Sequence, residues 1–118
     1  MKQIFLVEDD SAIAKNLSLL LYGEGFGVTH ASNRSGAEQL LSTHRFDLAL
    51  VDISLPDGNG FTVCTEIKAQ QDIPVIFLTA SGDEDDVLAA LSLGAVNYLK
   101  KPFLPKDLLE RIAKEFEK

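Results

Sequence analysis

The feature that most constrains the fold is a run of four apolar residues, 48–51, that ends in an aspartate, Asp52. Apolar residues without alternation predict a strand buried on both faces, as in a parallel sheet. The loop that follows, 53–60, is rich in Pro, Asp, Gly and Asn, which favour turns. Chemistry in open α/β sheets lies at the carboxyl ends of strands, which makes Asp52 a candidate site residue. A plain turn or helix-cap role for Asp52 also stays open here.

Similar signals recur along the whole chain, where apolar runs alternate with helical spacing of apolar residues. The second strand is more polar than the others, which favours a position at the edge of the sheet. Five strands that alternate with five helices predict a doubly wound (βα)5 α/β fold, with a five-stranded parallel sheet and helices on both faces. The predicted strands are 4–7, 26–31, 47–52, 75–78 and 96–99. The predicted helices begin at 10 or 11, 32 or 33, about 60, about 83 and about 105.

Length and charge narrow the class of protein. A chain of 118 residues is expected to form one domain, 1–118, around one core. Its net charge of −7 argues against direct contact with nucleic acid, because an acidic surface repels phosphates. A single cysteine, Cys64, excludes an internal disulfide and favours a cytoplasmic location. No apolar run is long enough for a membrane span, and no signal peptide is recognisable.

Polar side chains follow four of the predicted strands. Glu8 and Asp9 follow the first strand, Asp52 the third, Thr79 the fourth and Lys101 the fifth. Each of these residues alone is as easily a cap or a solvated side chain as a site residue. In a doubly wound sheet these four strands can lie side by side, which would bring their ends together. The combination therefore predicts a functional site at this edge.

The residue types indicate the chemistry of that site. Three carboxylates close together repel one another unless a cation neutralises them, and oxygen ligands favour Mg²⁺. With the metal bound, Asp52 is a candidate nucleophile toward a phosphoryl group, which would give an aspartyl phosphate. The ammonium of Lys101 and the hydroxyl of Thr79 would then contact the phosphoryl oxygens.

Four motifs together resemble the receiver domain of two-component response regulators. They are Val-Glu-Asp-Asp at 7–10, Leu-Val-Asp-Ile-Ser-Leu-Pro-Asp-Gly-Asn-Gly at 50–60, Leu-Thr-Ala at 78–80 and Gly-Ala-Val-Asn-Tyr-Leu-Lys-Lys-Pro-Phe at 94–103. The resemblance covers essentially the whole chain. It implies a flavodoxin-like fold in which Asp52 accepts phosphate from a phosphohistidine of a sensor histidine kinase. The output would be a change in the affinity for an output domain or another partner, most often in transcription regulation. Catalysis would be confined to the domain's own aspartate, so the chain is not expected to be an enzyme.

The resemblance also implies roles for individual residues. Glu8 and Asp9 match the family's acidic pair, with Asp9 as the direct Mg²⁺ ligand, and Asp10 is expected to cap a helix instead. The backbone carbonyl of Ser54 matches the third protein ligand, beside Asp52. Thr79 and Lys101 match the hydroxyl and the lysine that contact the phosphoryl group, whereas Lys100 is not assigned to the site.

Two further features follow from the resemblance. Tyr98 matches the aromatic residue that turns inward when Thr79 moves toward the phosphoryl group. A half-buried tyrosine with a solvated hydroxyl is the alternative, and the sequence does not separate the two. The bond between Lys101 and Pro102 matches a cis peptide of the family.

The chain departs from the family pattern on the face used for dimerisation, which comprises the fourth helix, fifth strand and fifth helix. Many DNA-binding regulators carry acidic residues before the switch aromatic, but this chain has Val96 and Asn97. Arg111 can serve a homodimer through this face, but its usual partner is in doubt. The chain also stops where many relatives continue into an output domain, so it is either a stand-alone receiver or a fragment.

Other functions are less consistent with these residues. Haloacid-dehalogenase-like phosphatases place a second acid two residues after the nucleophile, where this chain has Ser54. A plain divalent-metal module is the other alternative. However, in a calcium loop that began at Asp52, Pro56 and Asp57 would take positions five and six and Val63 position twelve, which does not match the pattern. Flavin binding is disfavoured because the acids at 8–10 would repel its phosphate.

The lifetime of the phosphoryl group is a separate expectation. Ser54 and Ser81 lie two residues after Asp52 and Thr79, where side chains can screen an attacking water. Small hydroxylated residues should screen poorly, so we predict a short-lived phosphoryl group.

Overall fold

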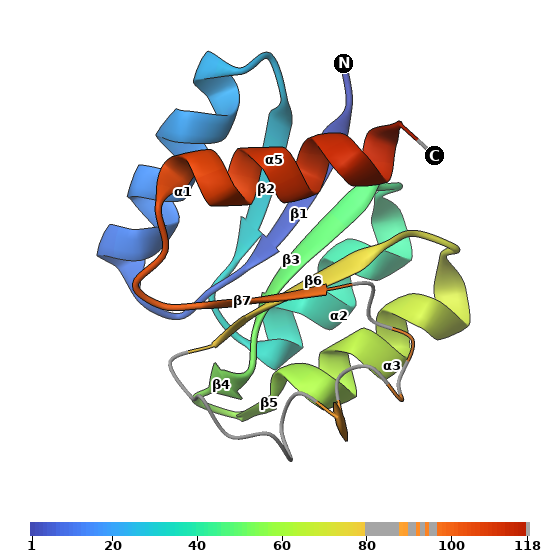
Figure 1. Ribbon diagram of the computed structural model, residues 1–118. Helices are drawn as coiled ribbons and strands as arrows, with labels where there is room; N and C mark the ends of the chain where they lie inside the picture. Colours follow the sequence, from blue (N-terminus) through green and yellow to red (C-terminus); the bar gives the residue numbers. More distant parts are fainter. Residues whose placement is uncertain (80–87, 90–91, 93, 95–96, 118) are drawn as a thin grey trace.

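The structure is a computed structural model that describes residues 1–79, 88, 89, 92, 94 and 97–117. Its main sheet has five parallel strands in the order β2–β1–β3–β6–β7 (Figure 1). The predicted parallel sheet is therefore confirmed, as is the edge position of the second strand. The strands are β1 (Gln3–Val7), β2 (Gly27–Ala31), β3 (Leu48–Asp52), β6 (Val75–Thr79) and β7 (Asn97–Lys100).

Helices cover both faces of this sheet. Helices α1 (Ser11–Gly23) and α5 (Pro105–Phe116) pack on one face, and α2 (Arg34–Thr43) and α3 (Gly60–Gln70) pack on the other (Figure 1). Most of the predicted helix from about residue 83 lies outside the described residues, as do Ser81 and Val96. Within the described part of the chain, no helix has both the length and the apolar character that a bilayer span requires.

The sheet divides the core into two layers. Phe5 and Val7 of β1 point toward α2 and α3, whereas Ile4 and Leu6 point toward α1 and α5. Every residue of β3 and β6 is buried. This burial on both faces explains why those strands read as unbroken apolar runs, since a strand with one solvated face would alternate. Each fully buried Leu, Ile or Phe stabilises the fold by about 1.5–3 kcal/mol.

Local side-chain chemistry sets where the helices begin and end. Asp10 caps α1 and Asn33 caps α2, each through a side-chain oxygen that accepts backbone N–H groups. For each helix the sequence left two neighbouring residues as possible caps, and one of the two forms the cap. Asn59 caps α3 in the same way. Gly25 ends the turn after α1 at a φ of 88°, a left-handed conformation that glycine adopts without strain.

Two details differ from the sequence prediction. The segment 53–60, which we predicted to be a loop, contains a short antiparallel hairpin of β4 (Ser54–Leu55) and β5 (Gly58–Asn59). Strands of two residues are too short to give a periodic signal. The helical spacing of the apolar residues in the last helix predicts that Leu108, Leu109, Ile112, Ala113 and Phe116 are buried. Leu108 and Ile112 are buried and Leu109 and Phe116 pack partly against the same core, but Ala113 is exposed.

Candidate functional site

The carboxyl ends of four neighbouring strands bring the predicted site residues to one edge of the sheet. Glu8 directly follows β1, Asp52 ends β3, Thr79 ends β6 and Lys101 directly follows β7. Because β1, β3, β6 and β7 are adjacent in this order, their ends lie side by side. The predicted convergence of these residues is therefore found in the structure.

Lys101 links the two buried carboxylates of the site. Its Nζ atom lies 3.0 Å from both Oε1 and Oε2 of Glu8 and 3.2 Å from Oδ2 of Asp52. The Glu8 side chain is fully buried, and that of Asp52 is only 8% exposed. Removing one partner of such a buried pair leaves an uncompensated charge, which typically costs about 3–5 kcal/mol. The ammonium is thus held next to the oxygen atoms at which chemistry would occur.

Burial and charge shift the ionisation of this group. Burial raises the pKa of Glu8 to about 7, helped by the nearby Asp52 carboxylate and opposed by the hydrogen bond from Lys101. Burial lowers the pKa of Lys101, but the carboxylates of Glu8 and Asp52 outweigh this effect, so the pKa is raised overall. One ammonium cannot neutralise several carboxylates, so the site favours an added cation.

Three acidic residues at this edge are placed to share a metal ion. Glu8, Asp9 and Asp52 each offer a carboxylate oxygen, and these atoms lie within 4.8 Å of one another. Opposite ligands of octahedral Mg²⁺ lie about 4.2 Å apart, so the carboxylates fit such an ion after a small adjustment. Asp9 is exposed, which leaves room for the waters that Mg²⁺ retains. Asp10 instead accepts hydrogen bonds from the first amides of α1, as predicted.

Backbone contacts hold the loop after Asp52 against the site. The Ser54 amide donates to Oδ1 of Asp52 at 3.1 Å, and the Gly60 amide donates to the Ile53 carbonyl at 2.7 Å. A Cβ at Gly60 would lie 2.3 Å from the Asp52 carbonyl oxygen, so only glycine allows this close approach. The ligand role of the Ser54 carbonyl remains a prediction.

The residues of the predicted switch lie on neighbouring strands. Thr79 is 3% exposed, and its carbonyl accepts a hydrogen bond from the Lys101 amide at 2.6 Å. The Tyr98 side chain is exposed, and its inward movement remains a prediction. The expected cis peptide between Lys101 and Pro102 is present. Ser81 lies outside the described residues, and the short lifetime of the phosphoryl group remains a prediction.

Two polar contacts were not predicted from the sequence, one beside the site and one at the amino end of β7. Nε2 of His30, on β2, lies 2.7 Å from the backbone carbonyl oxygen of Glu8, and no sequence pattern signals this contact. Arg111 of α5 donates from Nη1 to Oδ1 of Asn97 at 2.7 Å. The arginine whose partner was in doubt therefore has one within its own chain.

Known regulatory proteins are similar in sequence to almost the whole of this chain. The chain is 38% identical to the DNA-binding response regulator MtrA of Mycolicibacterium paratuberculosis, over 94% of this chain and 49% of MtrA. It is 42% identical to the transcriptional regulatory protein GltR of Pseudomonas aeruginosa, over 94% of this chain and 47% of GltR. The chain thus spans about half the length of these relatives.

A solved structure has the same fold as this chain. The BeF3-activated N-terminal receiver domain of Klebsiella pneumoniae RstA superposes with a TM-score of 0.93 at 27% identity, covering 99% of this chain and all of that domain. Residues 4–113 match the family described as the response regulator receiver domain. The matched range runs from β1 into α5 and therefore contains the strand ends described above. The chain therefore belongs to the response regulator receiver domain family.

Proposed function

We propose that the chain is a phosphorylation-dependent switch of a two-component system, with Asp52 as the phosphoacceptor. The observation that carries this proposal is the position of the Asp52 carboxylate, 3.2 Å from the Lys101 ammonium and within reach of the Glu8 and Asp9 oxygens. A carboxylate in this setting can attack phosphorus while neighbouring positive charge stabilises the phosphoryl oxygens.

The transfer itself is a displacement at phosphorus. An oxygen of Asp52 forms the new O–P bond, and the N–P bond of a kinase phosphohistidine breaks, with its electron pair remaining on the imidazole nitrogen. Lys101 and Thr79 would bind the phosphoryl oxygens, and Glu8, Asp9, Asp52 and the Ser54 carbonyl would hold Mg²⁺. When bound, the metal neutralises negative charge that develops on the phosphoryl group. The catalysis acts on the protein's own aspartate only, so the domain is not an enzyme toward external substrates.

The kinase would dock beside this site. A hollow of about 510 Å³ opens between α1 and the segment after β7, and its lining residues include Ile13, Leu17, Leu20, Lys101, Pro102 and Phe103. An apolar hollow next to the phosphoacceptor suits a helix that presents a phosphohistidine. We therefore assign this surface to a sensor histidine kinase.

The output would be transcriptional and indirect. The names of MtrA and GltR describe DNA-binding and transcriptional regulators, and both are about twice the length of this chain. The net charge of −7 suits a domain that acts on an output domain, a partner or a second copy of itself rather than on DNA. A homodimer would use a surface that includes β7 and α5, as the family resemblance implies. A single reduced cysteine and an intracellular kinase partner suit the cytoplasm.

Intact mass after incubation with acetyl phosphate tests this proposal. We expect one phosphoryl increment on the wild type that requires Mg²⁺ and is absent from Asp52→Asn. Asp47→Asn is the control, because Asp47 lies at the opposite edge of the sheet and, among the described residues, its carboxylate accepts a hydrogen bond only from the Gln3 amide. A phosphoryl group that persists in Asp52→Asn would show that another residue is the acceptor.

A further inference from the structure

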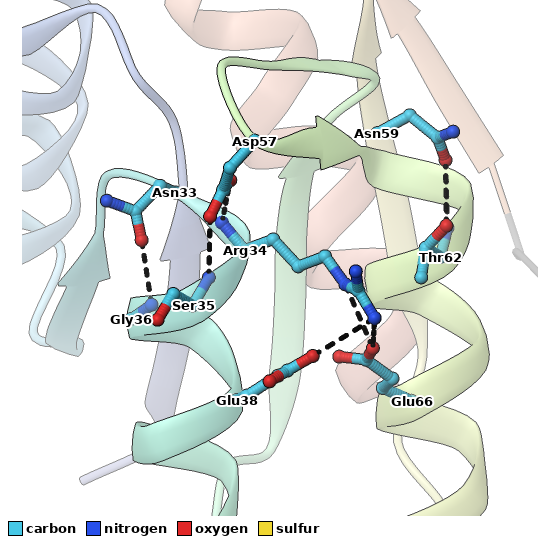
Figure 2. Close-up of polar contacts among 9 residues, drawn as sticks. All are labelled: Asn33, Arg34, Ser35, Gly36, Glu38, Asp57, Asn59, Thr62 and Glu66. Carbon is cyan, nitrogen blue, oxygen red and sulfur yellow. Dashed lines mark hydrogen bonds and ion pairs between the residues drawn. The ribbon is translucent and has the colours of Figure 1, made fainter.

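A charged cluster fastens the loop after Asp52 to the two helices beside it. We call Arg34, Asp57 and Glu66 the loop clamp (Figure 2). The Asp57 carboxylate accepts hydrogen bonds from the amides of Arg34 at 2.8 Å and Ser35 at 3.1 Å. These are the first amides of α2, which have no acceptor inside the helix and lie at its positive end. Asp57 therefore joins the hairpin to the start of α2.

The side chain of Arg34 extends the connection to α3. Its Nε and Nη2 atoms donate to Oε1 of Glu66 at 3.1 and 2.9 Å, as Figure 2 shows. Its stem packs against the hairpin, since a Cβ at Gly58 would lie 3.0 Å from the Arg34 Cδ atom. Arg34 thus touches α2, α3 and the hairpin at once. Nη2 also lies 3.2 Å from Glu38 on α2 itself, a contact that does not involve the loop.

The ionisation of the cluster agrees with this geometry. The amide of Arg34 holds the pKa of Asp57 below its usual range, and the Glu66 carboxylate raises the pKa of Arg34. Oε2 of Glu66 is buried and has no hydrogen-bond partner among the described residues. The bond from Arg34 to Oε1 is therefore the contact that compensates this carboxylate within the described structure.

The β4–β5 hairpin connects Asp57 to the site residue Asp52. Strand β4 pairs with β5 so that Ser54 faces Asn59 and Leu55 faces Gly58, with Asp57 in the connecting turn. The Ser54 amide in turn donates to Oδ1 of Asp52. The β4–β5 pairing and the Ser54 amide therefore connect the clamp residue Asp57 to Asp52 and to the Ser54 carbonyl.

We propose that Asp57 and Arg34 are positioning residues, which hold the β4–β5 hairpin in the conformation that lets Asp52 and the Ser54 backbone bind the cation and the phosphoryl group. The inference rests on the proposed function of Asp52. Neither residue touches the reacting atoms. They act by limiting the conformations of the loop before the ligand arrives, which lowers the entropy cost of forming the site.

Asp57→Ala tests the proposal against a matched control, Asp47→Ala. Both variants remove a carboxylate that accepts a backbone amide, but Asp47 bonds the Gln3 amide at the amino edge of the sheet, far from the site. Mg²⁺ is titrated by calorimetry without a phosphodonor, and hydrogen exchange of the Ser54 and Gly60 amides is measured in metal-free protein. Outer-shell partners change metal affinity by about 10–100-fold, and Asp57 acts one step further away, so we expect roughly 3- to 10-fold weaker binding.

Exchange of the Ser54 and Gly60 amides should accelerate in Asp57→Ala and stay unchanged in Asp47→Ala. With acetyl phosphate, Asp57→Ala should need a higher Mg²⁺ concentration for half-maximal phosphorylation than the wild type. The fold-increase in this concentration should exceed the fold-decrease in the phosphorylation rate at saturating Mg²⁺. Asp57→Asn keeps one acceptor oxygen and should recover part of the loss. It also replaces Asp57→Ala in every measurement if that variant does not fold.

The outcomes separate the inference from the function on which it rests. If the wild type takes up no phosphoryl group, the proposed function fails, while metal titration and amide exchange still test the clamp. If the wild type is phosphorylated but Asp57→Ala matches Asp47→Ala in Mg²⁺ affinity, amide exchange and urea midpoint, the positioning role is overturned. A lowered urea midpoint alone, with Mg²⁺ affinity unchanged, would make the clamp purely structural and would equally overturn it.

Discussion

Gly60→Ala is the substitution for which the structure makes the sharpest prediction. A Cβ at this position would lie 2.3 Å from the Asp52 carbonyl oxygen, and 2.9 Å from both the Asp52 carbonyl carbon and Ile53 Cα. All three are backbone atoms, two in the last residue of β3 and one in the residue that follows it, so no flexible side chain can move aside. Overpacking of a core typically costs about 1–3 kcal/mol, and we expect Gly60→Ala to lie at the upper end. Two of these atoms belong to Asp52, the proposed phosphoacceptor, so phosphorylation should also slow.

Urea denaturation followed by circular dichroism measures the first effect. With an m-value of about 1.5 kcal/mol per M, a loss of about 3 kcal/mol lowers the midpoint by about 2 M. Gly23→Ala is the control, because nothing lies within 4 Å of a Cβ at that position near the end of α1. This variant should be unchanged or slightly more stable. A Gly60→Ala midpoint that matches the wild type would refute the argument that β3 and α3 meet too closely for a side chain.

Three further predictions concern the core, the thiol and the clamp. Leu50→Ala should destabilise the domain by about 2–5 kcal/mol in urea, since Leu50 is fully buried. Leu19→Ala should change stability by less than about 0.5 kcal/mol, because Leu19 is 61% exposed. Burial raises the pKa of the Cys64 thiol, so a disulfide reagent should modify it only after unfolding, and rapid modification of native protein would contradict this placement. The lowered pKa of Asp57 means that its contribution to stability is present above the ordinary Asp pKa of about 4 and is lost as the pH falls below it. The difference in urea midpoint between wild type and Asp57→Asn should therefore narrow from neutral pH toward about pH 2.5, and a constant difference would count against the bond to the α2 amides.

The strands and their chemistry were predictable because local signals agree with one another. Unbroken apolar runs such as 48–51 indicated strands buried on both faces, and their burial in β3 and β6 confirms this interpretation. The alternation with helices limited the topology to a doubly wound sheet, which placed Glu8, Asp52, Thr79 and Lys101 at one edge. The family resemblance then supplied roles that no periodicity contains.

The tertiary structure decided which groups meet. Lys101 reaches Glu8 across 93 residues of sequence and Asp57 reaches Arg34 across 23, and neither pairing has a local signature. The exposure of Ala113 likewise depends on how α5 packs against the sheet.

What the sequence alone determined was therefore the type and order of the elements, the helix caps near Asp10 and Asn33, and the edge at which the chemistry lies. These features depend on backbone conformation and on burial patterns that repeat within a few residues. The contacts of Lys101, the close approach of Gly60 to Asp52 and the loop clamp required the three-dimensional structure. Such contacts depend on strand register and on helix packing, which join residues distant in the chain through side-chain shape and charge rather than through spacing.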